Sequence, residues 1–202
     1  MNGLILKDLL NLRSTIVSMV VISIIFSAIF ESSSLIFPAM IMACMVGTSF
    51  TYDRMADWDV YAVSIGVDRR KIVRSKFVLA LMLLSVGTII GILLSVCCHA
   101  LRGTGTDVGW LADNIMFAVG AGLITCAVSC TANFAVAPEK VAAVSSMISA
   151  LFIAVTISLS TIIGYNEVSI PEIIPYLVLA IGFVTLVSGY TASKRIFLKK
   201  DL

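Results

Sequence analysis

Six long apolar stretches that contain no charged residue constrain the fold of this chain more than any other feature. They cover residues 14–30, 35–51, 77–101, 114–136, 141–163 and 174–193. A helix needs about 20 mostly apolar residues, within a range of about 17–25, to cross the hydrocarbon core of a bilayer. The sequence therefore predicts an all-α integral membrane protein with six transmembrane helices, and it leaves little chain for a soluble domain.

The charged residues are few and lie outside these stretches. They make up 13% of the chain, whereas ordinary globular domains contain about 25%. Proton relays and many ion-coupled carriers need ionisable side chains inside the membrane. The distribution excludes most cytosolic enzymes and argues against a secondary transporter that works alone. The net charge of +2 is too small to indicate a nucleic-acid partner.

Lysine and arginine are distributed unequally between the two sides of the predicted membrane. With six helices, both termini lie on the same side as residues 52–76 and 137–140, and that side carries 13 of the 14 basic residues. Arg102 lies on the other side. Because basic loops stay in the cytoplasm, we expect a multi-pass plasma-membrane protein with cytoplasmic N- and C-termini.

Residues 1–13 are too polar to span a membrane and have the pattern of an amphipathic helix. Lys7, Asp8 and Asn11 fall on one face of a 3.6-residue period, and leucines such as Leu6 and Leu10 occupy the other. We expect an interfacial helix before the first span. Amphipathicity alone leaves open whether this helix is a simple anchor or the elbow helix of a transporter.

The longest polar connection, residues 52–76, holds ten of the 26 charged residues. Gly66 predicts a break within it, and Asp68 is a suitable N-cap for a helix that begins at Arg69 and continues into the third span. The basic residues from Arg69 to Lys76 are expected at the level of the lipid headgroups. They could simply fix the topology and bind anionic lipids.

The acidic half of the same connection points to a protein partner. Trp58 and Tyr61 stand beside aspartates in a segment expected in water, and exposed aromatic residues among mixed charges are typical of docking surfaces. The candidate docking residues are Trp58, Tyr61, Asp68, Arg69 and Arg70.

These residues also carry a family resemblance. The opening Met-Asn-Gly-Leu-Ile-Leu-Lys-Asp-Leu-Leu-Asn-Leu and the run from Tyr52 through Trp58, Tyr61 and Asp68-Arg-Arg to Phe77 resemble small permeases of the ABC-2 type. The likeness covers residues 1–202 as a single transmembrane domain, and it is most specific over residues 52–77. Similar proteins often read Leu-Pro-Val-Ser-Arg where this chain has Ile-Gly-Val-Asp-Arg, ending at Arg69.

The resemblance implies a function that the residues alone do not. Two six-helix subunits, identical or different, would pair in the lipid membrane and recruit separate ABC ATPase subunits. Residues 1–13 would form an elbow helix, and residues 52–76 would form the coupling segment that the ATPases move. The resemblance further implies export of a peptide, lipid or drug-like substrate. ATP and magnesium would be used by the partner, with no cofactor bound by this chain.

The remaining motifs are consistent with a protein that is not itself an enzyme. No Gly-x4-Gly-Lys-Ser/Thr nucleotide motif is present, and His99 is the single histidine, which makes a metal site or a serine triad improbable. The cysteines near His99, and Cys126 with Cys130, are expected to pack as apolar residues. The alternative function is a stand-alone membrane immunity or sensory protein that recruits no ATPase.

Two pairs of small residues four positions apart bear on how the helices pack. Gly87 and Gly91 lie in the third stretch, and Ser145 and Ser149 lie in the fifth. Small residues at this spacing allow close helix approach, either within one bundle or between subunits. The sequence leaves both possibilities open.

Overall fold

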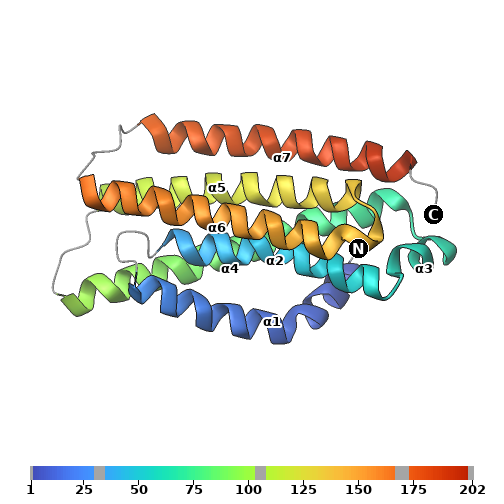
Figure 1. Cartoon of the computed structure of the whole chain (residues 1–202), viewed down its shortest axis with the longest axis horizontal. Coiled ribbons are helices and arrows are strands. Elements are labelled where there is room, and N and C mark those ends of the chain that lie inside the picture. Colours follow the sequence, from blue (N-terminus) through green and yellow to red (C-terminus); the bar gives the residue numbers. More distant parts are fainter. Residues whose placement is uncertain (1, 30–34, 103–107, 167–172, 200–202) are drawn as a thin grey trace.

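The computed structural model describes residues 2–29, 35–102, 108–166 and 173–199, and these form a bundle of helices. The elements in chain order are α1 (Asn2–Ile29), α2 (Ile36–Met55), α3 (Trp58–Ser64), α4 (Arg69–Arg102), α5 (Val108–Ala135), η2 (Pro138–Lys140), α6 (Val141–Asn166) and α7 (Ile173–Lys199). The long helices run side by side, and the short helix α3 lies at one end of the bundle (Figure 1). The predicted all-α fold is confirmed.

Five of the predicted spans have the length and apolar character needed to cross a membrane. Within the described residues, these are α1, α2, α4, α5 and α7. Helix α6 is 26 residues long, but its described apolar part is the shorter segment Val141–Val155. The span predicted over residues 141–163 therefore remains a prediction, and so does the total of six. Four acidic residues from the connections opposite residues 52–76, Glu31, Asp107, Glu167 and Glu172, lie outside the described residues.

The helices extend beyond the stretches that lipid alone would require. Helix α2 continues to Met55, and α4 begins at Arg69, so most of the predicted loop 52–76 is helical. The predicted break and helix start are confirmed: Gly66 has a φ of +84°, which suits glycine, and α4 follows directly after Asp68. The polar segment continues as helix because Asp68 caps α4 and because Asp53, Asp59 and Ala62 are buried against the bundle.

Helix α2 is the centre of the bundle, in contact with α1, α4, α5 and α6. In its spanning segment 83% of the residues are buried inside the bundle, whereas in those of α1 and α7 only 11% of the residues are buried. Close approach explains this packing: a Cβ atom at Gly87 of α4 would lie 2.6 Å from the carbonyl oxygen of Pro38, and one at Gly47 of α2 would lie 1.8 Å from Oγ of Ser145. Gly87 and Ser145 thus serve packing within one bundle.

Aromatic residues from four helices meet in the core near α3. The ring of Phe134 on α5 lies edge-on to Phe50 of α2, with centroids 4.8 Å apart, and lies 5.2 Å from Phe197 of α7. Phe77 of α4 makes a similar edge contact with Tyr190 of α7 at 5.4 Å. These contacts fasten α7 and α5 to α2 and α4, and they form an apolar layer beneath the polar end of the bundle.

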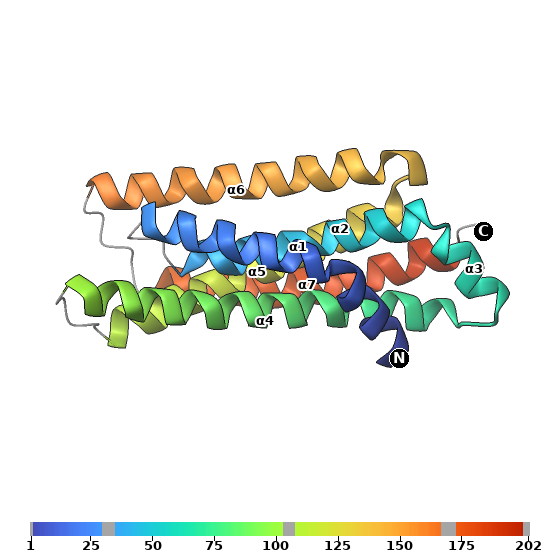
Figure 2. The ribbon, with the colours of Figure 1, turned by 90° about the horizontal axis from the view of Figure 1, so that it is seen from below.

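The start of α1 and the end of α7 both lie on the α3 side of the bundle (Figure 1). The predicted interfacial helix 1–13 is not a separate element, because α1 is continuous from Asn2, although its first turns lean away from the rest of the helix (Figure 2). Leu6 and Leu10 are exposed on the outside of the bundle, where an apolar face toward lipid is expected. Asp8 differs from the prediction, because it is buried and pairs with Lys76 inside the bundle.

Candidate functional site

Helix α3 and the two turns around it form the candidate site. The turn before α3 contains Asp57, whose φ of 45° is a left-handed conformation that aspartate tolerates better than most residues. After α3, Gly66 reverses the chain, and Oδ1 of Asp68 accepts a hydrogen bond from the backbone N–H of Arg70 at 2.9 Å. Asp68 therefore caps α4 as its sequence position predicts, and a short turn joins α3 to α4.

The structure separates the five candidate docking residues into two groups. Tyr61, Asp68 and Arg70 are exposed, with Tyr61 55% accessible. Trp58 is half-buried and packs against the hydrophobic core, although its ring also lies 5.5 Å from that of Tyr61. Arg69 is half-buried, and its Nη1 donates to the carbonyl oxygen of Leu198 at 3.4 Å. Trp58 and Arg69 thus hold the segment in place, whereas the other three face outward.

We use the name α3 surface for a set of exposed side chains from α3, the turn that follows it and the start of α4. Its apolar members are Val60, Tyr61 and Ile65, which are 51–57% accessible. Its charged members are Asp68, Arg70, Lys71 and Arg74. The surface combines apolar and aromatic contact area with a basic border. An apolar centre with a polar margin is the usual composition of a protein-binding surface.

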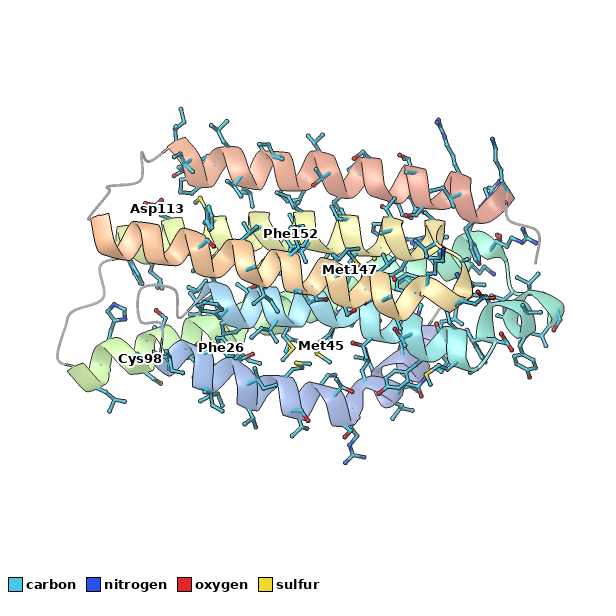
Figure 3. All side chains as sticks on the ribbon, viewed as in Figure 1. Phe26, Met45, Cys98, Asp113, Met147 and Phe152 are labelled. Carbon is cyan, nitrogen blue, oxygen red and sulfur yellow. The ribbon has the colours of Figure 1, made fainter. Side chains whose placement is uncertain are left out.

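Charged side chains gather at the α3 end of the molecule, whereas the labelled Met45 and Met147 lie along the apolar middle of the bundle (Figure 3). Some of these charges are buried in a group that the sequence did not predict. Nζ of Lys76 lies 3.0 Å from Oδ2 of Asp8, 2.5 Å from Oδ2 of Asp53 and 2.7 Å from Oγ of Ser49. Nζ of Lys7 lies 3.1 Å from Oδ1 of Asp8 and also pairs with Asp53. We call these five residues the ion cluster.

The ion cluster is buried because its charges balance. Lys76, Asp8 and Asp53 have side chains that are 3%, 2% and 4% exposed, and Lys7 is 23% exposed. Two cations face two carboxylates, so the cluster carries no net charge. The ammonium of Lys76 has three N–H donors and three acceptors within reach, and it also lies 5.3 Å from the centre of the Phe50 ring. Such pairing offsets the cost of removing charges from water.

This arrangement corrects the predicted position of Lys76. The sequence places Lys76 with the other basic residues at the lipid headgroups, but its side chain points inward from α4 and joins α1, α2 and α4. Asp8 belongs to α1, Asp53 to the end of α2 and Lys76 to the start of α4, so the three charges are separated by tens of residues in the sequence. The only signal in the sequence was that these opposite charges lie within two helical turns of the ends of three apolar stretches. That signal predicts an ion pair only when the three helices are known to be neighbours.

A second ion pair fixes α3 to α2. Nη1 of Arg54 lies 2.9 Å from Oδ2 of Asp59, and the two side chains are 9% and 8% exposed. Arg54 belongs to the last turn of α2, and Asp59 belongs to the first turn of α3. The pair therefore spans the turn between the two helices and sets the angle at which α3 leaves α2.

The described residues do not assemble a metal centre. Within the ranges that the structure covers, no group of three His, Cys, Asp or Glu side chains is arranged to hold a metal ion. The five cysteines are free thiols, of which Cys44, Cys126 and Cys130 are buried among the helices.

Comparison with known families decides the class. The family model described as "ABC-2 family transporter protein" matches residues 3–197. The chain belongs to the ABC-2 family of transporter proteins. Searches of curated proteins and of solved structures gave no significant match. As an ABC-2 transporter protein, the chain is a multi-pass membrane protein of the permease type, and such permeases generally work with an ABC ATPase and are not catalytic themselves.

Proposed function

We propose that this ABC-2 protein is the permease subunit of an exporter and that a separate ABC ATPase docks on the α3 surface. The observation that carries the proposal is the outward-facing set Tyr61, Ile65 and Arg70, which α3, the turn after it and the first turn of α4 present at the end of the bundle. The chain lacks a nucleotide-binding motif. ATP and magnesium are therefore used by the partner, and this chain supplies the membrane path and the docking site.

The proposed topology has six spans, with α6 as the fifth of them, and a cytoplasmic α3 surface. Support comes from the charge distribution, because 13 of the 14 basic residues fall on the side of the termini and residues 52–76. Further support comes from the common side on which α1 begins, α7 ends and α3 lies (Figure 1). With this topology, the α3 surface meets a soluble ATPase in the cytoplasm of a cell whose plasma membrane holds the permease.

The proposed mechanism is a movement of helices driven from α3. Two links join α3 to α2 and α4: the Arg54–Asp59 ion pair and the capped turn at Asp68. When the ATPases close on ATP, they displace α3, and α2 and α4 tilt with it as connected rigid elements. A second permease subunit, identical or different, completes the pathway. The substrate classes that this family likeness favours are peptides, lipids and drug-like molecules.

Partner-stimulated ATP turnover tests the docking site. Tyr61→Ala removes an exposed aromatic side chain from the α3 surface, and Tyr176→Ala is a matched control, because Tyr176 is 54% accessible and lies near the start of α7 at the opposite end of the bundle. A central interface residue contributes about 2 kcal/mol, which corresponds to about 30-fold in affinity. We expect the complex reconstituted with Tyr61→Ala to lose most of its stimulation at limiting ATPase concentration.

The control variant should retain full stimulation, and both variants should insert and purify normally. Equal turnover for Tyr61→Ala and the unmodified chain would contradict docking on the α3 surface. If purification in mild detergent yields no nucleotide-binding subunit and no ATPase is stimulated, the chain instead acts as a stand-alone membrane immunity or sensory protein.

A further inference from the structure

The ammonium of Lys7 touches three successive elements of the fold. It lies 3.1 Å from Asp8 on its own helix α1, pairs with Asp53 of α2, and sits 4.2 Å from the centre of the Trp58 ring at the start of α3. A cation over the face of an indole is attracted by the negative face of the ring. Lys7 thus links the ion cluster to the helix that carries the α3 surface.

The other lysine of the cluster has a different environment. The ammonium of Lys76 donates hydrogen bonds to Asp8 at 3.0 Å and to Ser49 Oγ at 2.7 Å, and it forms an ion pair with Asp53, so all of its partners here are oxygen atoms of the long helices. The ammonium of Lys7 pairs with the carboxylates of Asp8 and Asp53, and its third partner is the aromatic ring of Trp58. Lys76 therefore joins the long helices, and Lys7 extends that junction to α3.

Helix α3 needs such external support to keep a fixed position. It has seven residues, and helices this short are not stable alone in water. Its own residue Ala62 is fully buried on the inner face, and Arg54 binds Asp59 at 2.9 Å from the side of α2. The contact between Lys7 and Trp58 holds the first turn of α3 from the side of α1. With both contacts in place, the outward direction of Tyr61 is fixed.

We propose that Lys7 is a positioning residue that holds Trp58 and thereby fixes α3 against α1, so that α1 moves together with α3 when a partner displaces it. The inference rests on the proposed role of α3 as the docking helix, but the contact itself can be tested without a partner. It also gives the N-terminal part of α1 a function beyond anchoring the chain in the membrane.

The fluorescence of Trp58 reports the contact directly. The chain has two tryptophans, so Trp110→Phe leaves Trp58 as the single emitter. In this background we expect Lys7→Met to move the emission of Trp58 to longer wavelength and to increase quenching by acrylamide, because the ring is released toward water. Lys7→Arg should restore both values, since arginine also stacks on aromatic faces. Arg13→Met, an exposed cation on the same helix, is the matched control.

A charge-balanced variant separates positioning from general damage to the cluster. Lys7→Met alone leaves two carboxylates with one cation, and Lys7→Met combined with Asp8→Asn restores neutrality around Lys76. If Lys7 positions α3, Trp58 stays released in the double variant even though the gel-filtration profile and the unfolding temperature recover. A return of the Trp58 emission to its original wavelength in the double variant would overturn the proposal.

Turnover with the ATPase partner completes the test. Lys7→Met and the charge-balanced double variant should lose most partner-stimulated turnover, and Lys7→Arg should keep it. Unchanged turnover in Lys7→Met, when Tyr61→Ala abolishes stimulation, overturns the positioning role while docking on α3 stands. If Tyr61→Ala has no effect but Trp58 is released in Lys7→Met, the docking assignment fails and the contact between Lys7 and α3 stands.

Discussion

Two groups of charged residues lie at the same end of this bundle and have opposite environments. In the ion cluster, Lys76 is surrounded by carboxylates and a hydroxyl and is 3% exposed. Two positions earlier on the same helix, Arg74 is exposed, as are Lys71 and Arg70. The first group joins helices α1, α2 and α4, and the second group borders the α3 surface.

The difference shows that the side of a helix on which a charge falls decides its role. Residues Arg74 and Lys76 are two positions apart, and neighbours at this spacing point in different directions from a helix. A buried charge must be paired, so it fixes the structure around it. An exposed charge is free to meet lipid headgroups or a partner protein. The predictions below test this contrast, beginning with the largest expected effect.

Replacing Lys76 should be the most damaging single change. Lys76→Met leaves Asp8 and Asp53 buried with one cation between them, and removing one partner of a buried ion pair costs about 3–5 kcal/mol in the free energy of unfolding. Thermal unfolding in detergent measures the effect. The matched control is Lys71→Met, in which an exposed lysine of the same helix is changed in the same way.

The control should unfold within about 0.5 kcal/mol of the unmodified chain, because surface substitutions usually have small effects. Equal unfolding temperatures for Lys76→Met and Lys71→Met would remove the contrast between the two groups.

The Arg54–Asp59 pair should have an intermediate effect. Its 2.9 Å contact is mostly buried but joins a short terminal helix and not the centre of the bundle. A hydrogen bond to a charged group contributes about 1.5–3 kcal/mol, so we expect Arg54→Gln to lower stability by an amount in that range. Limited proteolysis should then cut near α3 before the rest of the bundle. Unchanged protease resistance of this segment would show that the pair does not hold α3.

A double-mutant cycle measures the coupling inside the ion cluster. Lys7→Met and Asp8→Asn, 3.1 Å apart at the charged atoms, should together cost less than the sum of their separate effects. Interacting pairs show coupling energies of about 0.5–3 kcal/mol, and we expect about 1 kcal/mol here because Lys7 is partly exposed. Unfolding temperatures of the four proteins provide the data. Strict additivity would mean that Lys7 does not belong to the cluster energetically.

The exposed cations should give the smallest effect on affinity. Arg70→Ala and Arg74→Ala remove charges from the border of the α3 surface, where an exposed ion pair contributes about 0–1 kcal/mol. We expect a several-fold loss of ATPase affinity at low salt that disappears as salt is added, because exposed charges are screened. Binding measured at several ionic strengths tests this. A salt-independent loss would mean that these residues are buried in the complex.

The sequence was a good guide to everything that depends on local pattern. Apolar stretches predicted the long helices, Gly66 predicted the break, and Asp68 predicted the start of α4, because each depends on the properties of a few adjacent residues. The resemblance carried by Trp58, Tyr61 and their neighbours also led to the family that the match over residues 3–197 shows.

The ion cluster and the buried side of Trp58 could not be found in this way. Lys76 and Asp8 are 68 positions apart, and their pairing depends on which helices become neighbours. The rule that charges avoid the membrane places them correctly at helix ends, but it does not distinguish water from the interior of the protein. For the same reason Trp58 was expected on the surface, whereas it packs beneath Lys7.

The central claim is that the α3 surface receives an ABC ATPase, and a photo-crosslinking experiment tests it most directly. A photoreactive phenylalanine is placed at Tyr61 or, as the control, at Tyr176, which is equally exposed at the other end of the bundle. Illumination of intact cells should join the chain at position 61 to a protein whose peptides include a Walker A motif, and position 176 should give no such product. Absence of that product at position 61, or its appearance at position 176, would contradict the account.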